Sequence, residues 1–333
     1  MRPIRYGDIR QILTSVADTT VTITSPTKRH FLITGSAAMY VLVLPDARTI
    51  GLGTPFVFEN RSSEFVGVRN SSSVTWRRVP PRATCICALS DQTTAAGVWF
   101  SRVDESHDPA EGYHFSNDFH SIFASNNSYG ELAMTGAVSA GGTNILYTTA
   151  SAAFVGTCRT GVTTINSYAQ LYTSRYSILG GGPTAVELRT WFNSLSTAGE
   201  EYICRAGFGD NITGGAHANG VYFIYDRAAS GDFWVTRTIA AAGGSTSNIS
   251  TIVPSINSVI PNALRVEVSS TGARVDFFVS KTLLFTHSIA ANIPTTVTAF
   301  PQFGVTKTVV TADAARSVNV DFFDFIRSFT TPR

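Results

Sequence analysis

The acidic side chains best placed for chemistry lie in two predicted strands of the C-terminal half. Glu187 stands in VELRTW, and Asp321 and Asp324 stand in NVDFFDF. Hydrolysis of a glycosidic bond uses two carboxyl groups that flank the bond, at a separation that fixes the stereochemical outcome. These three residues are more simply interpreted as outward-facing or strand-end polar side chains, so no catalytic residue is assigned.

Histidines gather between the two halves of the chain, close to acidic residues. Three histidines fall within fourteen residues, together with three acidic residues: His107, His114, His120, Asp108, Glu111 and Asp118. Imidazole and carboxylate groups are common metal ligands, but this spacing matches no established ligand pattern. A solvated loop is the simpler interpretation, and neither a metal nor a cofactor is predicted.

The four cysteines are predicted to be small buried side chains. Cys85 and Cys87 project from the same face of one strand, whereas Cys158 and Cys204 are isolated. A zinc site would need a second Cys or His pair at ligand spacing, and the sequence offers none. No Gly-x-Ser-x-Gly motif anchors a nucleophilic serine.

A polar, glycine-rich stretch between two strands, GDNITGGAHAN (209–219), is the best candidate for a contact surface. Aromatic rings on the neighbouring strands could hold a sugar by stacking, although the same rings could instead fill the core of a sandwich. The predicted ligand-binding residues are Asp210, Asn211, His217, Asn219, Tyr222 and Trp234.

A β-hairpin is predicted to position these residues. Val221–Tyr225 and Phe233–Thr238 are rich in aromatic and β-branched residues and flank a polar turn. Strand alternation puts Tyr222 and Ile224 on one face, and the opposite face is also apolar. This strand should therefore lie inside a sheet with protein on both sides. Later strands such as Ala263–Val268 have a single apolar face, which a second sheet must cover.

Composition excludes several classes of protein. Hydrophobic residues make up 44% of the 333 residues and charged residues 14%, which is unlike a disordered chain. The net charge of +2 and the scattered basic residues give no nucleic-acid-binding stripe. No run is long and apolar enough for a membrane span or a signal peptide, so synthesis and folding in a cytoplasm are expected.

Two domains are predicted, 1–103 and 113–333. They are joined by a linker at 104–112, where the amino-acid sequence becomes polar and acidic. The first carries short strands at the regular spacing of a sandwich or barrel, with no repeat of fixed period. Its leading segment, Ile9–Val16, could be a short helix or an extended arm. The predicted strands are Thr20–Thr24, His30–Thr34, Tyr40–Leu44, Pro55–Glu59, Phe65–Arg69, Val74–Val79, Cys85–Leu89 and Val98–Ser101.

The sequences of the predicted strands, and their order along the chain, resemble those of a known family. The order runs GGGPTAVELRTWF (180–192), EEYICRAGFGD (200–210), GVYFIYDR (220–227), a long stretch at 264–295, and SVNVDFFDFIR (317–327). Over about residues 110–330 this text resembles the concanavalin A-like jelly roll at the C-terminal end of bacteriophage tail-fibre and appendage proteins. VLPDARTIGLGTPFVFENRSSEFVGVRNSSSVTW (43–76) resembles a small β module of phage tail proteins.

The resemblance implies an all-β virion structural protein: a small N-terminal β-sandwich or barrel module for attachment, followed by a lectin-like jelly roll that binds a host-surface glycan without turnover. Glucanases on this jelly roll carry Glu-x-Asp-x-Glu on one strand, and that text is absent here. The alternatives are a polysaccharide depolymerase on the same fold and a purely architectural head or neck decoration protein.

The resemblance also implies partners and a location. We expect a protein made in the host cytoplasm and assembled into the virion with other virion proteins, as a homo-oligomer in which a trimer is favoured. The strands near Tyr40–Leu44 and Pro55–Phe58 are expected to supply the main subunit interface.

Overall fold

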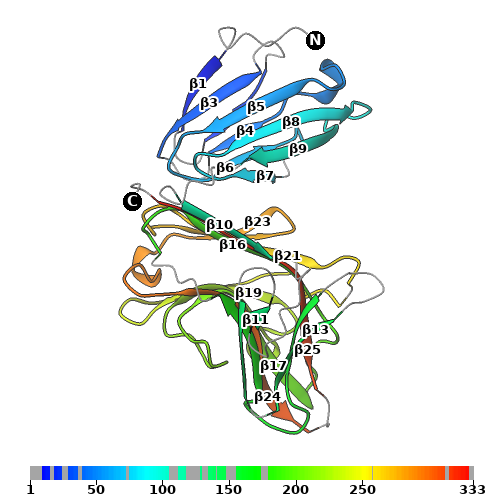
Figure 1. Cartoon of the computed structure of the whole chain (residues 1–333), viewed down its shortest axis with the longest axis vertical. Helices are drawn as coiled ribbons and strands as arrows, with labels where there is room; N and C mark the ends of the chain where they lie inside the picture. The colour runs from blue at the N-terminus through cyan, green and yellow to red at the C-terminus, as the bar shows by residue number, and fades with distance from the viewer. Residues whose placement is uncertain are drawn as a thin grey trace. The chain divides into compact units, whose positions relative to one another are not determined.

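The chain folds into two β units (Figure 1). The computed structural model describes residues 10–15, 19–24, 29–36, 40–72, 75–104, 112–117, 128–129, 134–139, 141–147, 155–173, 179–256, 258–311 and 315–329. Contacts between Cα atoms divide the chain into 1–113 with 328–333, and 114–327. No helix in the described ranges is both long and apolar enough to cross a membrane.

The first unit is built from two facing sheets. The five-stranded sheet has the order β1 (Arg10–Ser15), β3 (His30–Gly35), β5 (Pro55–Asn60), β8 (Thr84–Asp91) and β9 (Val98–Asp104). The four-stranded sheet has the order β2 (Thr20–Thr22), β4 (Val41–Val43), β6 (Val66–Arg69) and β7 (Thr75–Val79). A 3-10 turn, η1 (Ala47–Thr49), follows β4. The leading segment is thus a strand, which resolves the choice between a helix and an extended arm.

The first six strands form a coil. They alternate between the two sheets, and each lies parallel to the strand two places earlier, so that β1, β3 and β5 are parallel neighbours, as are β2, β4 and β6. The antiparallel strands β7, β8 and β9 close the coil at one end. Parallel pairing stacks Phe31 beside Phe58 inside the coil, with ring centroids 5.4 Å apart.

The strands expected to form the subunit interface lie inside their sheets. β4 is paired on both sides, by β2 and β6, and β5 by β3 and β8. Leu42 and Phe56 are fully buried in the core of this unit. Neither strand therefore has a free backbone edge to offer a second subunit.

The second unit is a sandwich of two eight-stranded sheets. The β16 sheet contains β13 (Thr143–Tyr147), β14 (Val155–Arg159), β25 (Ser317–Ser328), β16 (Thr184–Phe192), β21 (Asn262–Val268), β22 (Val275–Val279) and β23 (Thr282–His287), with β10 (Gly112–Asn117) also paired to β25. The β17 sheet contains β11 (Ser128–Tyr129), β12 (Met134–Ser139), β15 (Tyr168–Thr173), β24 (Phe300–Val310), β17 (Glu200–Gly209), β18 (Gly220–Asp226), β19 (Trp234–Ala240) and β20 (Gly244–Ile249).

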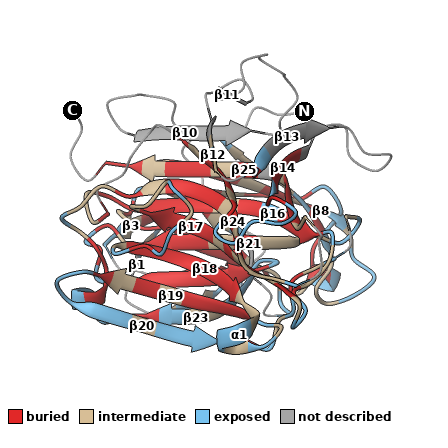
Figure 2. Cartoon of the chain, turned by 90° about the horizontal axis from the view of Figure 1, so that it is seen from below, coloured by how far each residue is buried: buried red, intermediate tan, exposed pale blue. Residues whose placement is uncertain are grey.

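Apolar side chains join the two sheets of this sandwich. Phe208 of β17 packs edge-on against Phe325 of β25, and Phe223 of β18 against Phe277 of β22. Strands β18 and β19 lie deep in the sandwich, whereas the edge strand β20 is exposed (Figure 2). The prediction of an all-β chain with a jelly-roll sandwich in its C-terminal part is confirmed.

Short helical turns complete the second unit. The hairpin predicted around 220–238 is present as β18 and β19, joined by α1 (Arg227–Ser230). A second 3-10 turn, η2 (Ala290–Asn292), follows β23.

Every sheet of the first unit uses strands that end by Asp104, and both sheets of the second use strands that begin at Gly112 or later.

Candidate functional site

The outer face of the β17 sheet is the floor of the candidate site. Strand alternation sends Tyr202, Cys204 and Phe208 into the core between the sheets. The intervening positions of β17 therefore face outward, and Arg205 is among them. The register with neighbouring strands extends this face in two rows. One row across the strands consists of Gln302, Gly207, Tyr222 and Arg237. The other consists of Gln170, Gly304, Arg205 and Ile224.

Glycines in this floor leave room for neighbouring side chains to pack over it, and we call the part of this face under the loop 210–219 the trough. A Cβ on Gly209 would lie 2.1 Å from Gln302 Nε2 and 2.4 Å from His217 Cε1. A Cβ on Gly304 would lie 3.0 Å from the Gln170 side chain. Because these positions lack side chains, polar groups from neighbouring strands and from the loop above can occupy the space.

The loop 210–219 is held in shape by its own polar side chains. Asn211 accepts hydrogen bonds through Oδ1 from the backbone N–H and the hydroxyl of Thr213, both at 2.7 Å. Its Nδ2 donates to the Ala216 carbonyl at 3.2 Å. At the base of the loop, Asn219 Nδ2 donates to Asp210 Oδ2 at 2.9 Å. These bonds fix the loop through the asparagines that the sequence analysis selected.

The loop folds back over the trough. The Gly214 N–H donates to Gln170 Oε1 at 3.1 Å, and its carbonyl accepts from Arg205 Nη1 at 3.2 Å and Thr306 Oγ1 at 2.6 Å. His217 places its ring edge-on to Tyr222, with centroids 4.8 Å apart, and its Nε2 lies 3.3 Å from Gln302 Nε2. A cavity of about 10 Å³ remains beneath the loop, room for one water molecule.

Burial keeps the imidazole of His217 neutral. Its side chain is almost fully buried, and burial, followed by the positive charge of Arg205, lowers its pKa to about 3. The carboxylate of Asp210, whose Oδ1 lies 3.7 Å from Nδ1, acts in the opposite direction but does not restore the pKa. The neutral ring accepts the Asn211 N–H at Nδ1, at 3.2 Å. Such an imidazole holds the loop and is a weak base.

Aromatic rings flank the trough. Tyr172 of β15 and Phe300 of β24 are half-buried, and their rings meet edge-on with centroids 6.0 Å apart. The register places Tyr172 beside Gln302 and Phe300 beside Gly209, so both adjoin the base of the loop. Half-exposed rings beside amide and hydroxyl groups are suited to stacking on a sugar.

The structure brings together five of the six predicted ligand-binding residues. Asp210, Asn211, His217 and Asn219 are linked within the loop, and Tyr222 lies against His217. Trp234 does not join them. It is fully buried among aromatic rings on the inner face of the sheet, and its Nε1 donates to Asn262 Oδ1 at 3.1 Å. Alternation along β19 turns Val235 and Arg237 outward instead.

The residues of the polar floor were not among the predicted ligand-binding residues: Gln170, Arg205, Arg237 and Gln302. Arg237 was detectable in principle, because it is the lone charge within an otherwise apolar or hydroxyl-bearing strand, at a position that alternation turns outward. Arg205 also stands at an outward position, within an apolar run of β17 that follows two glutamates. The two glutamines gave no comparable signal, since their role depends on contacts with the loop.

The other candidates lie elsewhere. Glu187 accepts from Arg265 Nη1 at 3.1 Å, and Arg265 Nε also bonds Glu267 at 2.7 Å, in an ion-paired row of the β16 sheet. The four cysteines are free and buried. Among the described residues no three His, Cys, Asp or Glu side chains form a metal-binding group. His114 lies in β10, and the remaining members of that cluster are outside the described residues: His107, Asp108, Glu111, Asp118 and His120.

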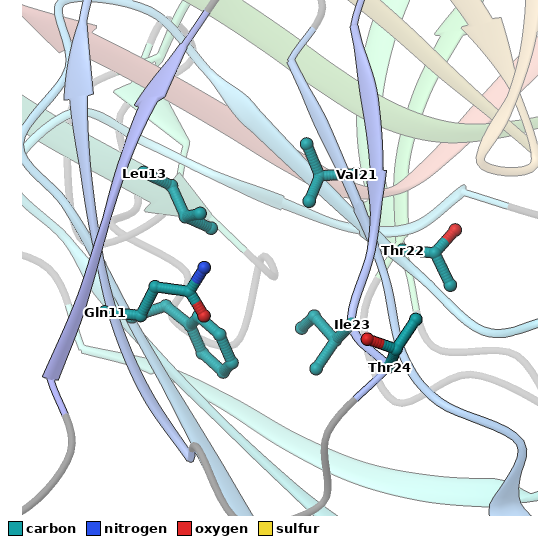
Figure 3. Close-up of a pocket in the computed structure, with 7 residues that line it drawn as sticks. Gln11, Leu13, Val21, Thr22, Ile23 and Thr24 are labelled. Carbon is teal, nitrogen blue, oxygen red and sulfur yellow. The ribbon is translucent and has the colours of Figure 1, made fainter.

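The first unit contains an open cavity of about 210 Å³ between β1 and β2 (Figure 3). It is lined by a mixture of apolar and uncharged polar residues: Gln11, Leu13, Val21, Thr22, Ile23, Thr24 and Phe31. Without a charged or titratable side chain in its lining, this cavity offers no chemistry comparable to that of the trough.

Comparison with known proteins gives structural likenesses alone. No family model matches the chain, and no curated protein matches its sequence. Similar solved structures include the carbohydrate recognition domain of Emp47p (13% identity, 67% of this chain and 99% of that one, TM-score 0.38). Others are arcelin-5, a lectin-like defence protein from Phaseolus vulgaris (8%, 66% and 99%, TM-score 0.41), and a GlcNAcα1-4Gal-releasing endo-β-galactosidase from Clostridium perfringens (8%, 69% and 66%, TM-score 0.44). At such low identities and TM-scores these likenesses carry no argument about ligand or activity.

Proposed function

We propose that this chain is a bacteriophage virion protein, a tail fibre or appendage, whose second unit binds a host-surface glycan at the trough of the β17 sheet. The observation that carries the proposal is the pair of half-buried rings, Tyr172 and Phe300, beside the hydrogen-bonded loop 210–219. The virion role rests on the resemblance of the strand sequences to those of phage tail proteins. The expected partners, the other virion proteins, rest on the same resemblance.

Binding without turnover is the version that the geometry favours. The imidazole of the trough has a pKa of about 3 and spends Nδ1 on the Asn211 amide, so it is poorly suited to remove a proton near neutral pH. Glu187 is engaged with Arg265 on the other sheet. A depolymerase is the second candidate, and an architectural head or neck decoration protein is the third.

A homo-oligomer, with a trimer favoured, would serve such binding. A single contact of millimolar affinity is worth about 4 kcal/mol. Linked copies make later contacts intramolecular and raise avidity by roughly a hundredfold or more. Light scattering on the full chain tests the oligomer, and imaging of particles carrying labelled protein tests the location in the virion.

The test of binding compares substitutions in the site with a matched control. Tyr172→Ala and Phe300→Ala should abolish retention on host capsule or lipopolysaccharide. Ile249→Ala, at an exposed position on β20, should not change it. Release of reducing or unsaturated sugar ends by the wild type would favour the depolymerase. Wild-type protein that binds no host glycan would leave the architectural role.

A further inference from the structure

Two arginines on the floor of the trough lack a carboxylate partner among the described residues. Arg205 makes one hydrogen bond there, from Nη1 to the Gly214 carbonyl at 3.2 Å, and its buried Nε has no acceptor in the same ranges. Arg237 is half-buried on β19, and its Nε is likewise buried without an acceptor in the part of the chain that is described. Two other arginines of this unit do have carboxylate partners: Arg265 bonds Glu187 and Glu267, and Arg274 bonds Asp276 at 3.0 Å.

The two guanidinium groups flank Tyr222. Arg237 lies directly across from Tyr222 in the pairing of β18 with β19. Gly207 lies across from Tyr222 on the other side, and Arg205 is two residues before Gly207 on the same face of β17. Burial lowers the pKa of Arg205; Tyr222, Cys204 and Asp226 act in the opposite direction, and the positive charge of Arg237 lowers it. Each arginine is thus within electrostatic reach of the other.

Two acidic groups lie near this pair. Asp210 accepts a hydrogen bond from Asn219 through Oδ2, whereas its buried Oδ1, 3.7 Å from His217 Nδ1, has no hydrogen-bond donor in the described part of the chain. Asp226 stands at the end of β18, opposite Ile203. Neither forms an ion pair with Arg205 or Arg237 in the described part of the chain. The trough therefore carries two positive charges with unused N–H donors, although the whole chain has a net charge of only +2.

We propose that the glycan is acidic, and that Arg205 and Arg237 hold its anionic group beside Tyr222. This inference rests on the glycan-binding function proposed above. A guanidinium presents its donors as a planar fork that matches carboxylate and similar oxyanions, and charge-assisted bonds of this kind are short and strong. An anion between the two arginines relieves their repulsion and satisfies the buried donors. A uronic acid carboxylate and a sulfate ester share this chemistry.

The experiment measures affinity of the full chain for three families of oligosaccharide by titration calorimetry. The first are oligouronates, the second are the same oligouronates with each carboxyl group reduced to an alcohol, and the third are sulfated galactans. We expect binding to an anionic family at least tenfold tighter than to the carboxyl-reduced one, and weakening as salt is raised. Preference for the first or the third identifies carboxylate or sulfate as the anion.

Variants assign the effect to the arginines. Arg205→Gln and Arg237→Gln should each weaken acidic binding about tenfold or more, as loss of a charge-assisted bond implies. Arg189→Gln, at an exposed position of the other sheet, is the matched control and should leave binding unchanged. Arg237→Lys keeps the charge without the fork and should bind more weakly than the wild type. Thermal unfolding verifies that each variant folds.

The possible outcomes distinguish failure of the acidic-ligand proposal from failure of the proposed glycan binding. Equal affinity for oligouronates and their carboxyl-reduced forms, with sulfated glycans no tighter, would overturn the acidic ligand and leave glycan binding intact. Folded arginine variants that bind as the wild type does would also overturn it. Failure to bind any host glycan, neutral or acidic, would overturn the proposed function itself.

Discussion

The ion pair between Lys307 and Glu200 gives a stability prediction of large size. Nζ of Lys307 lies 2.8 Å from Glu200 Oε2, and both side chains are fully buried. The ammonium also donates to the carbonyl oxygens of Gly161 and Val162, so it ties β24 to β17 and to the segment after β14. Replacing Lys307 with Met leaves a buried carboxylate without its partner and two carbonyls without this donor.

The expected cost of Lys307→Met is about 3–5 kcal/mol, the range for breaking a buried ion pair by removal of one partner. This is a large share of the roughly 5–15 kcal/mol that stabilises a typical domain. The double variant Lys307→Met with Glu200→Leu removes both charges, and most of the loss should return. The two carbonyls then remain without this donor, at about 1–3 kcal/mol for such groups.

The free energy of unfolding of both variants is measured by urea denaturation, followed by tryptophan fluorescence. Urea is uncharged and therefore does not screen the ion pair. Two of the four tryptophans, Trp76 and Trp99, belong to the first unit and two, Trp191 and Trp234, to the second. Only the transition of the second unit should shift, which makes the first an internal control. A loss below about 1 kcal/mol in Lys307→Met, or a double variant no more stable than Lys307→Met, would refute the reasoning.

Three further predictions concern other positions. Gly209→Ala should displace the loop, since the new Cβ would meet Gln302 and His217, and limited proteolysis should then cleave within 210–219 faster than in the wild type. Asn60→Ala should destabilise the first unit by about 2 kcal/mol or more in urea, because the buried Asn60 amide donates to the Glu64 and Val79 carbonyls at 2.8 and 2.9 Å. Burial lowers the pKa of His287 to about 4 and that of His217 to about 3, below the unfolded value of about 6.5. The second unit should therefore keep its full stability above about pH 6.5 and lose it as the pH falls toward 4, and replacing both histidines with Gln should flatten this dependence.

Local patterns in the sequence predicted most strands and the hairpin and loop that make up part of the candidate site. Alternation along Val221–Tyr225 and the polar text of 209–219 indicate a hairpin strand and an adjoining loop, and both exist. Local patterns could not predict that the loop packs over the sheet, because its contacts there are with Gln170 and Gln302, which are distant in the sequence. Trp234 was predicted to bind the ligand but packs in the core, the alternative kept for these rings, because composition alone does not say which side of an aromatic strand meets the core.

The coil of the first unit escaped detection for a different reason. Its strands in the five-stranded sheet begin at Arg10, His30 and Pro55, and so are spaced by 20 and 25 residues. Unequal spacing produces no fixed period in the sequence. Parallel neighbours also lack the tight turns that mark a hairpin.

The coiled path of β1–β6 has a consequence for how such a protein can change in evolution. Every turn of the coil adds one parallel strand to each sheet and leaves the closing strands β7–β9 at the same end. Duplication or deletion of one turn would therefore alter the length of the unit in steps of about 4.8 Å, the spacing between strands, without disturbing the cap or the second unit's registers. The length of the first unit would thus change only in whole turns, independently of changes in the sequence of the second unit.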